Sequence, residues 1–167
     1  MLGDLSGKTL LIEGASGAVG SAAAQFAIAA GATVIGTGRE SNLAYLSSLG
    51  AVATTYGSGL AERVVVLAPG GVDAALHAAQ SDSLKDLLAI VGDPAKVVTV
   101  TNSQEAARLG TLKADARNDS ALLRQATDLG RAGRYTPRVD HELPLAEIVE
   151  AHTLAAKGSG KVVVTLA

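Results

Sequence analysis

Residues 12–40 read IEGASGAVGSAAAQFAIAAGATVIGTGRE. Within this stretch Gly14, Gly17 and Gly20 lie three residues apart, between an apolar run and an alanine-rich run. Glycine has no Cβ and tolerates positive φ, so such a turn can be tight and its backbone can approach a ligand closely. The apolar run predicts a strand, and alanine, the best helix former, predicts the helix that follows.

The start of that helix is a predicted anion site. Its first backbone N–H groups have no partners within the helix, and the helix dipole adds positive potential there. The spacing Ala15-x-Gly17-x-x-Gly20 is the dinucleotide-binding fingerprint with alanine in the first place. We therefore expect the pyrophosphate of a dinucleotide at this turn. The alternative is a glycine-rich strand–helix turn without a ligand.

The next apolar run ends in Thr37-Gly38-Arg39-Glu40, which bears on the choice of cofactor. In NAD-binding proteins an acidic residue about 20 residues after the fingerprint holds the ribose 2′-hydroxyl. Gly38 occupies that place and Arg39 follows it. A guanidinium favours the 2′-phosphate of NADP, which a carboxylate would repel. The sequence thus favours NADP(H), and the alternative is a solvated Arg39–Glu40 pair on a loop.

Composition narrows the class of protein. The chain has 167 residues, of which 48% are hydrophobic and 2% aromatic, and its net charge is −2. This balance argues against a nucleic-acid or anionic-membrane partner. There is no cysteine, and no apolar segment approaches the roughly 18 residues of a spanning helix. Because Asp4 and Lys8 interrupt the first apolar run, we recognise no signal peptide and expect a cytoplasmic protein.

Apolar, β-branched runs alternate with helical stretches along the chain. This alternation predicts a parallel sheet covered on both faces, which is a Rossmann-type doubly wound α/β fold of about six strands in three α/β/α layers. The predicted strands are residues 8–13, 33–37, 51–56, 72–77, 96–101 and 109–114. The predicted helices are residues 21–30, 42–49, 60–68, 83–91 and 119–131. Residues 1–135 would form this domain, and residues 136–167 a tail with a helix over 145–157 and a closing strand over 161–166.

The order of motifs resembles the cofactor domain of the medium-chain dehydrogenase/reductase superfamily, in particular its zinc-free quinone oxidoreductase and enoyl reductase branch. The motifs are GASGAVGSAAAQFAIAAGATVIGTG at 14–38, LSSLGAVATTY at 46–56, GGVDAALHAA at 70–79, KVVTVTN at 96–102 and LPLAEIVEAHTLAAKGSGKVVVTLA at 143–167. The resemblance implies hydride transfer from NADPH to a small-molecule quinone or enone without zinc.

The resemblance also implies a set of cofactor contacts. Those around the pyrophosphate are Ala15, Ser16, Gly17, Ala18, Val19 and Gly20. Those around the adenosine ribose and its 2′-phosphate are Thr37, Gly38, Arg39 and Tyr56, and those at the nicotinamide end are Ala78, Ala79, Thr101 and Asn102. The chain departs from the family pattern where Leu43 replaces a lysine, where His77 and Gln80 replace an acid and a glycine, and where Thr101 replaces a glycine.

Members of this superfamily carry a GroES-like domain ahead of the cofactor domain. Met1 stands a few residues before the first predicted strand, so we expect the cofactor-binding part alone, inactive in isolation and with catalytic residues unknown. Residues 136–167 would pack on that domain in the family, and their apolar surface could instead make a homodimer contact. The alternative function is a stand-alone NADP(H)-binding module, acting as a sensor or oligomerisation partner without turnover.

Two other chemistries match less well. His77, His141 and His152 lack metal-ligand spacing, so no metal site is expected. His77 would lie at a strand end, as an acid/base group or, more commonly, as a hydrogen-bonded wall residue. A short-chain dehydrogenase would need a tyrosine followed four residues later by lysine, and each of the three tyrosines has leucine or valine at that position.

Overall fold

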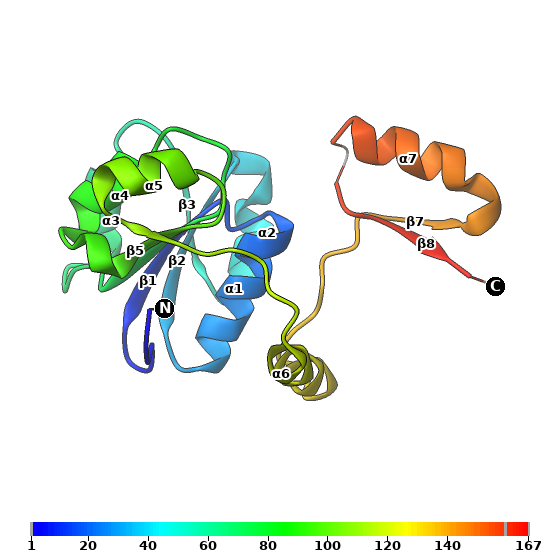
Figure 1. The fold of residues 1–167 in the computed structure, drawn as a ribbon, viewed down its shortest axis with the longest axis horizontal. Coiled ribbons are helices and arrows are strands. Elements are labelled where there is room, and N and C mark those ends of the chain that lie inside the picture. Colours follow the sequence, from blue (N-terminus) through cyan, green and yellow to red (C-terminus); the bar gives the residue numbers. More distant parts are fainter. Residues whose placement is uncertain (1, 159, 167) are drawn as a thin grey trace. The chain divides into compact units, whose positions relative to one another are not determined.

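The computed structural model describes residues 2–158 and 160–166. The chain forms two compact units, Met1–Tyr135 and Thr136–Ala167 (Figure 1).

The first unit contains a six-stranded sheet in the order β3-β2-β1-β4-β5-β6, in which every neighbouring pair is parallel. Its strands are β1 (Thr9–Glu13), β2 (Thr33–Gly38), β3 (Val52–Thr55), β4 (Ala74–His77), β5 (Val97–Thr99) and β6 (Leu112–Lys113). Its helices are α1 (Ala18–Ala29), α2 (Leu43–Ser48), α3 (Leu60–Leu67), α4 (Leu84–Val91), α5 (Ser103–Leu109) and α6 (Ser120–Arg131). The predicted Rossmann-type fold is confirmed.

Alternation along the strands creates two cores, one on each face of the sheet. Leu10 and Ile12 belong to a cluster that includes side chains of α1 and α2, whereas Leu11 belongs to one with side chains of α3, α4 and α5. Figure 1 shows the corresponding helices on opposite faces of the strands. Each fully buried leucine or isoleucine stabilises the fold by about 2 kcal/mol of transfer free energy. A strand that is apolar on both faces therefore requires the three layers.

Helix α1 packs on the sheet and on the preceding turn through small residues. Ala24 and Ala27 are buried there. A Cβ built on Gly20 would lie 2.2 Å from the carbonyl oxygen of Gly14 and 2.7 Å from Cα of Ala15. Only glycine fits this position, so Gly20 sets the distance between the helix start and the preceding turn.

The structure differs from the sequence prediction after β5. Residues 109–114 were expected to form one strand, but that prediction was wrong for its first part, because Leu109 ends helix α5. Gly110 then turns the chain with φ +70°, and only Leu112–Lys113 pairs with β5. The helix was overlooked because its cap, Asn102, was interpreted as a cofactor contact beyond the end of the preceding strand. Elsewhere the predicted bounds differ from the observed ones by a few residues at the ends of elements.

Helix α6 is amphipathic, as predicted, and Asp119 is its cap. The Asp119 carboxylate accepts hydrogen bonds from the backbone N–H groups of Ala121 and Leu122, at 2.9 and 3.3 Å. The chain after α6 returns to α1, where the rings of Phe26 and Tyr135 lie 4.8 Å apart between centroids. These contacts attach α6 to the first unit.

The second unit is a small β-α-β arrangement. Strands β7 (His141–Pro144) and β8 (Val162–Thr165) pair in parallel, and α7 (Ile148–Ala156) connects them after a 3-10 turn. Leu143 and Ala151 are buried between the strands and the helix. Asp140 accepts a hydrogen bond from the N–H of Lys161 at 2.7 Å, which lowers the pKa of its carboxyl, with Arg138 contributing in the same direction.

We predict that Gly20→Ala destabilises the protein by about 2 kcal/mol, because the added methyl group overpacks a site that cannot expand. Helix propensity alone would favour alanine by about 1 kcal/mol, so the sign of the change isolates the steric effect. The measurement is the free energy of unfolding in urea. The matched control is Gly130→Ala in α6, where the nearest atom to the new Cβ is 3.7 Å away. A stabilising Gly20→Ala substitution would contradict the close approach.

Candidate functional site

The candidate site lies at the carboxyl ends of the central strands. The strand order reverses between β1 and β4, and in open α/β sheets ligands bind beyond the carboxyl ends of the strands at such a switch point. A cleft of about 430 Å³ opens there. Its lining comes from the ends of four neighbouring strands and the turns that follow them: Glu13, Gly14, Ser16, Gly17, Thr37, Gly38, Arg39, Asn42, Tyr56, Ala78, Ala79, Gln80 and Ser81.

The turn after β1 forms the floor of the cleft. Gly14 adopts φ +76°, and a Cβ on it would lie 2.9 Å from backbone atoms of Ala78 and Ala79. The N–H of Ala15 donates to the carbonyl oxygen of Thr37 at 3.1 Å, which ties this turn to β2. Backbone from three strands therefore converges here with no side chain in between.

The first turn of α1 presents backbone N–H groups toward this end of the sheet. Its N-cap is Gly17, which has no side chain to accept from them, and the first turn of Ala18–Ala29 carries no acidic residue. Unpaired N–H groups together with the positive end of the helix dipole favour an anion.

The end of β2 supplies the cation Arg39 and the glycine Gly38, whose neighbours leave little room for a side chain. Arg39 is exposed at the rim of the cleft, and it forms no ion pair within residues 2–158 and 160–166. Three residues later, Asn42 Nδ2 donates to Ser16 Oγ at 3.4 Å and so joins the β2 end to the glycine-rich turn. Thr37 Oγ1 is fully buried and has no hydrogen-bond partner in the described part of the chain.

The end of β3 contributes Tyr56, half of whose surface is exposed beside the cleft. Arg63 on α3 holds the loop that carries this tyrosine. Its guanidinium donates to Thr54 Oγ1 at 3.2 Å and to the carbonyl oxygens of Ser58 and Thr55, both at 2.9 Å. The sequence offered no signal for this role of Arg63.

The end of β4 contributes the wall formed by residues 78–81. His77, the last residue of β4, is fully buried and does not reach the cleft. Burial lowers the pKa of His77 below 6.5 and outweighs the opposing influence of the Glu13 charge and of the Ser81 backbone. His77 therefore lies behind the wall, whereas its neighbours Glu13 and Ser81 line the cleft.

The structure brings most of the predicted contact residues together and leaves some outside the lining. Ala15 is buried beneath the turn, Val19 is half-exposed on the first turn of α1, and Gly20 packs against Gly14. Ala18 is also on that turn, beside the lining residue Gly17. These four support the cleft rather than line it.

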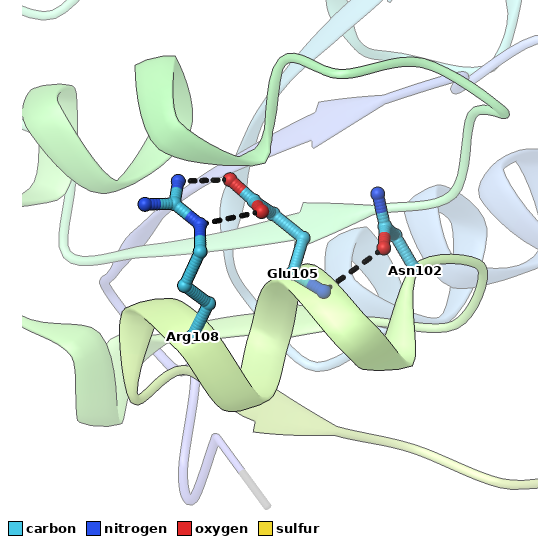
Figure 2. Close-up of polar contacts among 3 residues, drawn as sticks. All are labelled: Asn102, Glu105 and Arg108. Carbon is cyan, nitrogen blue, oxygen red and sulfur yellow. Dashed lines mark hydrogen bonds and ion pairs between the residues drawn. The ribbon is translucent and has the colours of Figure 1, made fainter.

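Thr101 and Asn102 follow β5, at the predicted end of the sheet, but neither lines the cleft. Asn102 is the cap of α5, as Figure 2 shows: its Oδ1 accepts from the N–H of Glu105 at 3.1 Å. Glu105 in turn forms an ion pair with Arg108, which lowers the pKa of the Glu105 carboxyl. The Asn102 side chain is thereby committed to the helix.

Several lining residues were not predicted as contacts: Glu13, Gly14, Asn42, Gln80 and Ser81. Gly14 could have been found as the first glycine of the run, and Glu13 as the last residue of a central strand. Asn42 and Ser81 carry no local signal, because turns bring them to the cleft from outside the strands.

No group of three or more His, Cys, Asp or Glu side chains that could hold a metal ion occurs among the described residues. No helix in the part of the chain that the structure describes is both long and apolar enough to cross a bilayer.

The fold and the cleft define a nucleotide-binding Rossmann domain, and comparison with known proteins places it further. A family model described as zinc-binding dehydrogenase matches residues 18–141. The chain belongs to this family, and the predicted membership of the medium-chain dehydrogenase/reductase superfamily is confirmed. The family consists of dehydrogenases that bind NAD(P), so a pyridine nucleotide is the expected ligand class. The comparison with curated proteins gave no match.

Several solved structures share the fold. An NAD-dependent alcohol dehydrogenase is 24% identical with a TM-score of 0.82, over 99% of this chain and 53% of that one. The CurK enoyl reductase is 24% identical with a TM-score of 0.79, over 100% of this chain and 57% of that one. The quinone oxidoreductase from Coxiella burnetii is 22% identical with a TM-score of 0.74, over 98% of this chain and 54% of that one. At these identities the likeness shows the fold, and this chain spans about half the length of each.

We predict that Asn102→Ala destabilises the protein by about 1 kcal/mol, because the N–H of Glu105 loses its acceptor at the start of α5. The measurement is the midpoint of urea unfolding. Asn118→Ala is the matched control, since Asn118 is exposed and precedes the cap of α6 without serving as it. Equal effects of the two substitutions would contradict the capping role.

Proposed function

We propose that the chain binds NADP(H) and is the cofactor-binding part of a zinc-independent oxidoreductase that reduces a quinone, an enone or an enoyl group. The observation that carries this proposal is the convergence on one cleft of a glycine-rich turn, an uncapped helix start and an unpaired arginine. NADPH, when bound, supplies the hydride, and the residues of this chain bind and orient it.

The floor of the cleft suits a pyrophosphate. Gly14 and Gly17 leave the backbone open to a ligand, and the N–H groups at the start of α1 favour a negative charge. The buried hydroxyl of Thr37, which has no partner within the described residues, is a further polar group at this cleft that a ligand could satisfy.

The end of β2 favours NADP over NAD. An NAD-type site needs a carboxylate here, but a Cβ on Gly38 would lie 3.1 Å from Leu46 Cδ1 and 3.5 Å from Ser16 Oγ. A longer acidic side chain would have to displace these neighbours. Arg39 instead offers a guanidinium at the rim, with Asn42 beside it on the adjoining turn. One of the structures with the same fold is named as NAD-dependent, so the preference rests on these residues and not on the comparison.

The alternative function is a binding module that holds NADP(H) without turnover, as a sensor or as a partner in an oligomer. This chain spans about half the length of the similar structures, and a binding role needs only the cleft that these residues form. Consumption of NADPH by the chain with a panel of quinones and enones, above the rate of the free cofactor, would exclude the binding module.

The second unit exposes two large apolar side chains. Val149 and Leu166 each expose nearly four-fifths of their surface. We propose that these side chains are covered by a second copy of the chain or by a further domain. A concentration-independent monomer in sedimentation equilibrium would exclude the homodimer.

We predict that the chain binds NADPH more tightly than NADH, and that Arg39→Ala weakens NADPH binding about tenfold while leaving NADH binding nearly unchanged. The guanidinium interacts with the 2′-phosphate, which NADH lacks, and tenfold corresponds to about 1.4 kcal/mol. The measurement is calorimetric titration at moderate salt.

Arg117→Ala is the matched control, because Arg117 is an exposed arginine remote in sequence from every lining residue of the cleft. Equal loss of affinity in both variants would indicate a general charge effect. Tighter binding of NADH than of NADPH by the unmodified chain would contradict the proposed preference.

A further inference from the structure

Three polar side chains are buried next to one another at the carboxyl ends of β1, β4 and β5. Glu13 is 4% exposed, and His77 and Thr99 are fully buried. They are register partners on neighbouring strands, Glu13 opposite His77 and His77 opposite Thr99. Buried polar groups of this kind must be hydrogen-bonded, so their bonds define how each is protonated.

The hydrogen bonds at Nδ1 of His77 are satisfied when this nitrogen is an acceptor. Thr99 Oγ1 accepts from the N–H groups of Thr101 and Asn102, both at 3.2 Å, which fills its lone pairs. Its hydrogen is then free to be donated to His77 Nδ1 at 2.9 Å. The Thr101 hydroxyl, 3.1 Å from the same nitrogen, donates to the carbonyl oxygen of Ala79 at 2.7 Å.

The hydrogen bonds at Nε2 of His77 are satisfied when this nitrogen carries a hydrogen and donates it. His77 Nε2 lies 3.0 Å from Ser81 Oγ, and Ser81 Oγ donates to Glu13 Oε1 at 3.2 Å. Ser83 Oγ donates to the second carboxylate oxygen of Glu13. Ser81 Oγ also lies 2.8 Å from Ser83 Oγ. Whether Glu13 or Ser83 takes the hydrogen of Ser81, the Ser81 oxygen is left to accept, so the imidazole donates through Nε2–H. A continuous chain thus runs from Thr99 through His77 and Ser81 to Glu13.

We propose that His77, as a neutral Nε2–H imidazole, is a positioning residue that fixes residues 78–81, the wall of the cleft at its nicotinamide end. It acts through Ser81 and not by contact with a ligand, because His77 does not line the cleft whereas Ser81 does. The inference of a nicotinamide end rests on the proposed function, but the tautomer and its effect on the wall do not.

Further contacts attach the wall to the strands, and one of them lies beside His77. The Thr101 hydroxyl that holds Ala79 is placed beside His77 Nδ1. Ala78 is joined to β1 by its N–H, which donates to the carbonyl oxygen of Glu13 at 2.9 Å, and its backbone packs against Gly14. A shift of Ser81 would therefore move the wall relative to the floor of the cleft.

Protonation of His77 would disrupt this arrangement. A hydrogen on Nδ1 could not be accepted by Thr99 Oγ1, whose lone pairs are already filled by two amides, so it would turn to Thr101 Oγ1 at 3.1 Å and the bond from Thr99 would be lost. The groups that face the ring are the Glu13 carboxylate from β1, the hydroxyls of Thr99 and Thr101 from β5 and its far end, and Ser81 from the wall. The negative charge of Glu13 favours the protonated ring, but burial opposes it more strongly and lowers the pKa of His77.

The lowered pKa of His77 determines how the stability of the fold depends on pH. The unfolded chain takes up a proton on His77 near its ordinary pKa of 6.5, whereas the folded chain does so only at lower pH. The stability contributed by the neutral ring is fully present above pH 6.5 and is lost as the pH falls through the folded pKa. Residues 78–81 are expected to become less ordered as the pH falls through the folded pKa of His77.

The test is NMR of the free protein labelled with ¹⁵N, in which three histidines give resolvable imidazole signals. We expect one ring to show the Nε2–H tautomer at pH 7 and to stay neutral as the pH is lowered below 6.5. His77→Gln should remove that signal and shift the amide resonances of Ala78, Ala79 and Ser81. His152→Gln is the matched control and should leave those three amides unchanged.

Thr99→Val provides a second variant that keeps the imidazole and removes the hydroxyl that donates to it. We expect the Nε2–H tautomer to lose its predominance and the same wall amides to shift. The proposal is overturned if the His77 ring is already protonated at pH 6.5, if it carries its proton on Nδ1, or if the wall amides are unmoved in both variants. Because all readouts are taken without cofactor, failure to bind NADPH would overturn the proposed function and leave this inference standing.

Discussion

The site depends on one steric constraint, the close approach of the β1–α1 turn to the structures on either side of it. On one side the backbone of Gly14 meets the β4 wall at a distance that excludes a Cβ, and on the other Gly20 lets the first turn of α1 pack onto Gly14. Both contacts need glycine, and together they aim the start of α1 at the switch point of the sheet. The anion-binding property of the helix start follows from this placement.

The polar groups at the site are positioned by the parallel arrangement of the strands. Because parallel strands end at one edge of the sheet, Glu13, His77 and Thr99 are brought together although they are far apart in the sequence. Their buried side chains are joined by hydrogen bonds, through Ser81 between His77 and Glu13, at the base of the cleft, and the guanidinium of Arg39 is exposed at its rim. A cleft with a cationic rim over an internally satisfied polar layer suits a charged dinucleotide better than an apolar ligand.

The sequence predicts those parts of the fold and site that local chemistry determines. Residue type and spacing are enough to predict the roles of Gly14 to Gly20, of the small residues of α1 and of the missing acid at Gly38. The roles of Asn42 and Ser81 were not, because they depend on how a turn returns to the cleft. Asn102 has a cofactor-like position in the sequence, but its side chain caps α5, a competing role that only the observed helix reveals.

Binding of the NADPH pyrophosphate at the glycine-rich turn can be tested by mapping amide chemical shifts during a titration with NADPH. We expect the largest changes at Gly14, Ser16 and Gly17 and on the first turn of α1, with a second group at Arg39 and Asn42. Changes confined to another surface, such as the apolar groove between α1 and α6 lined by Phe26 and Leu129, would show that the pyrophosphate does not bind at this turn.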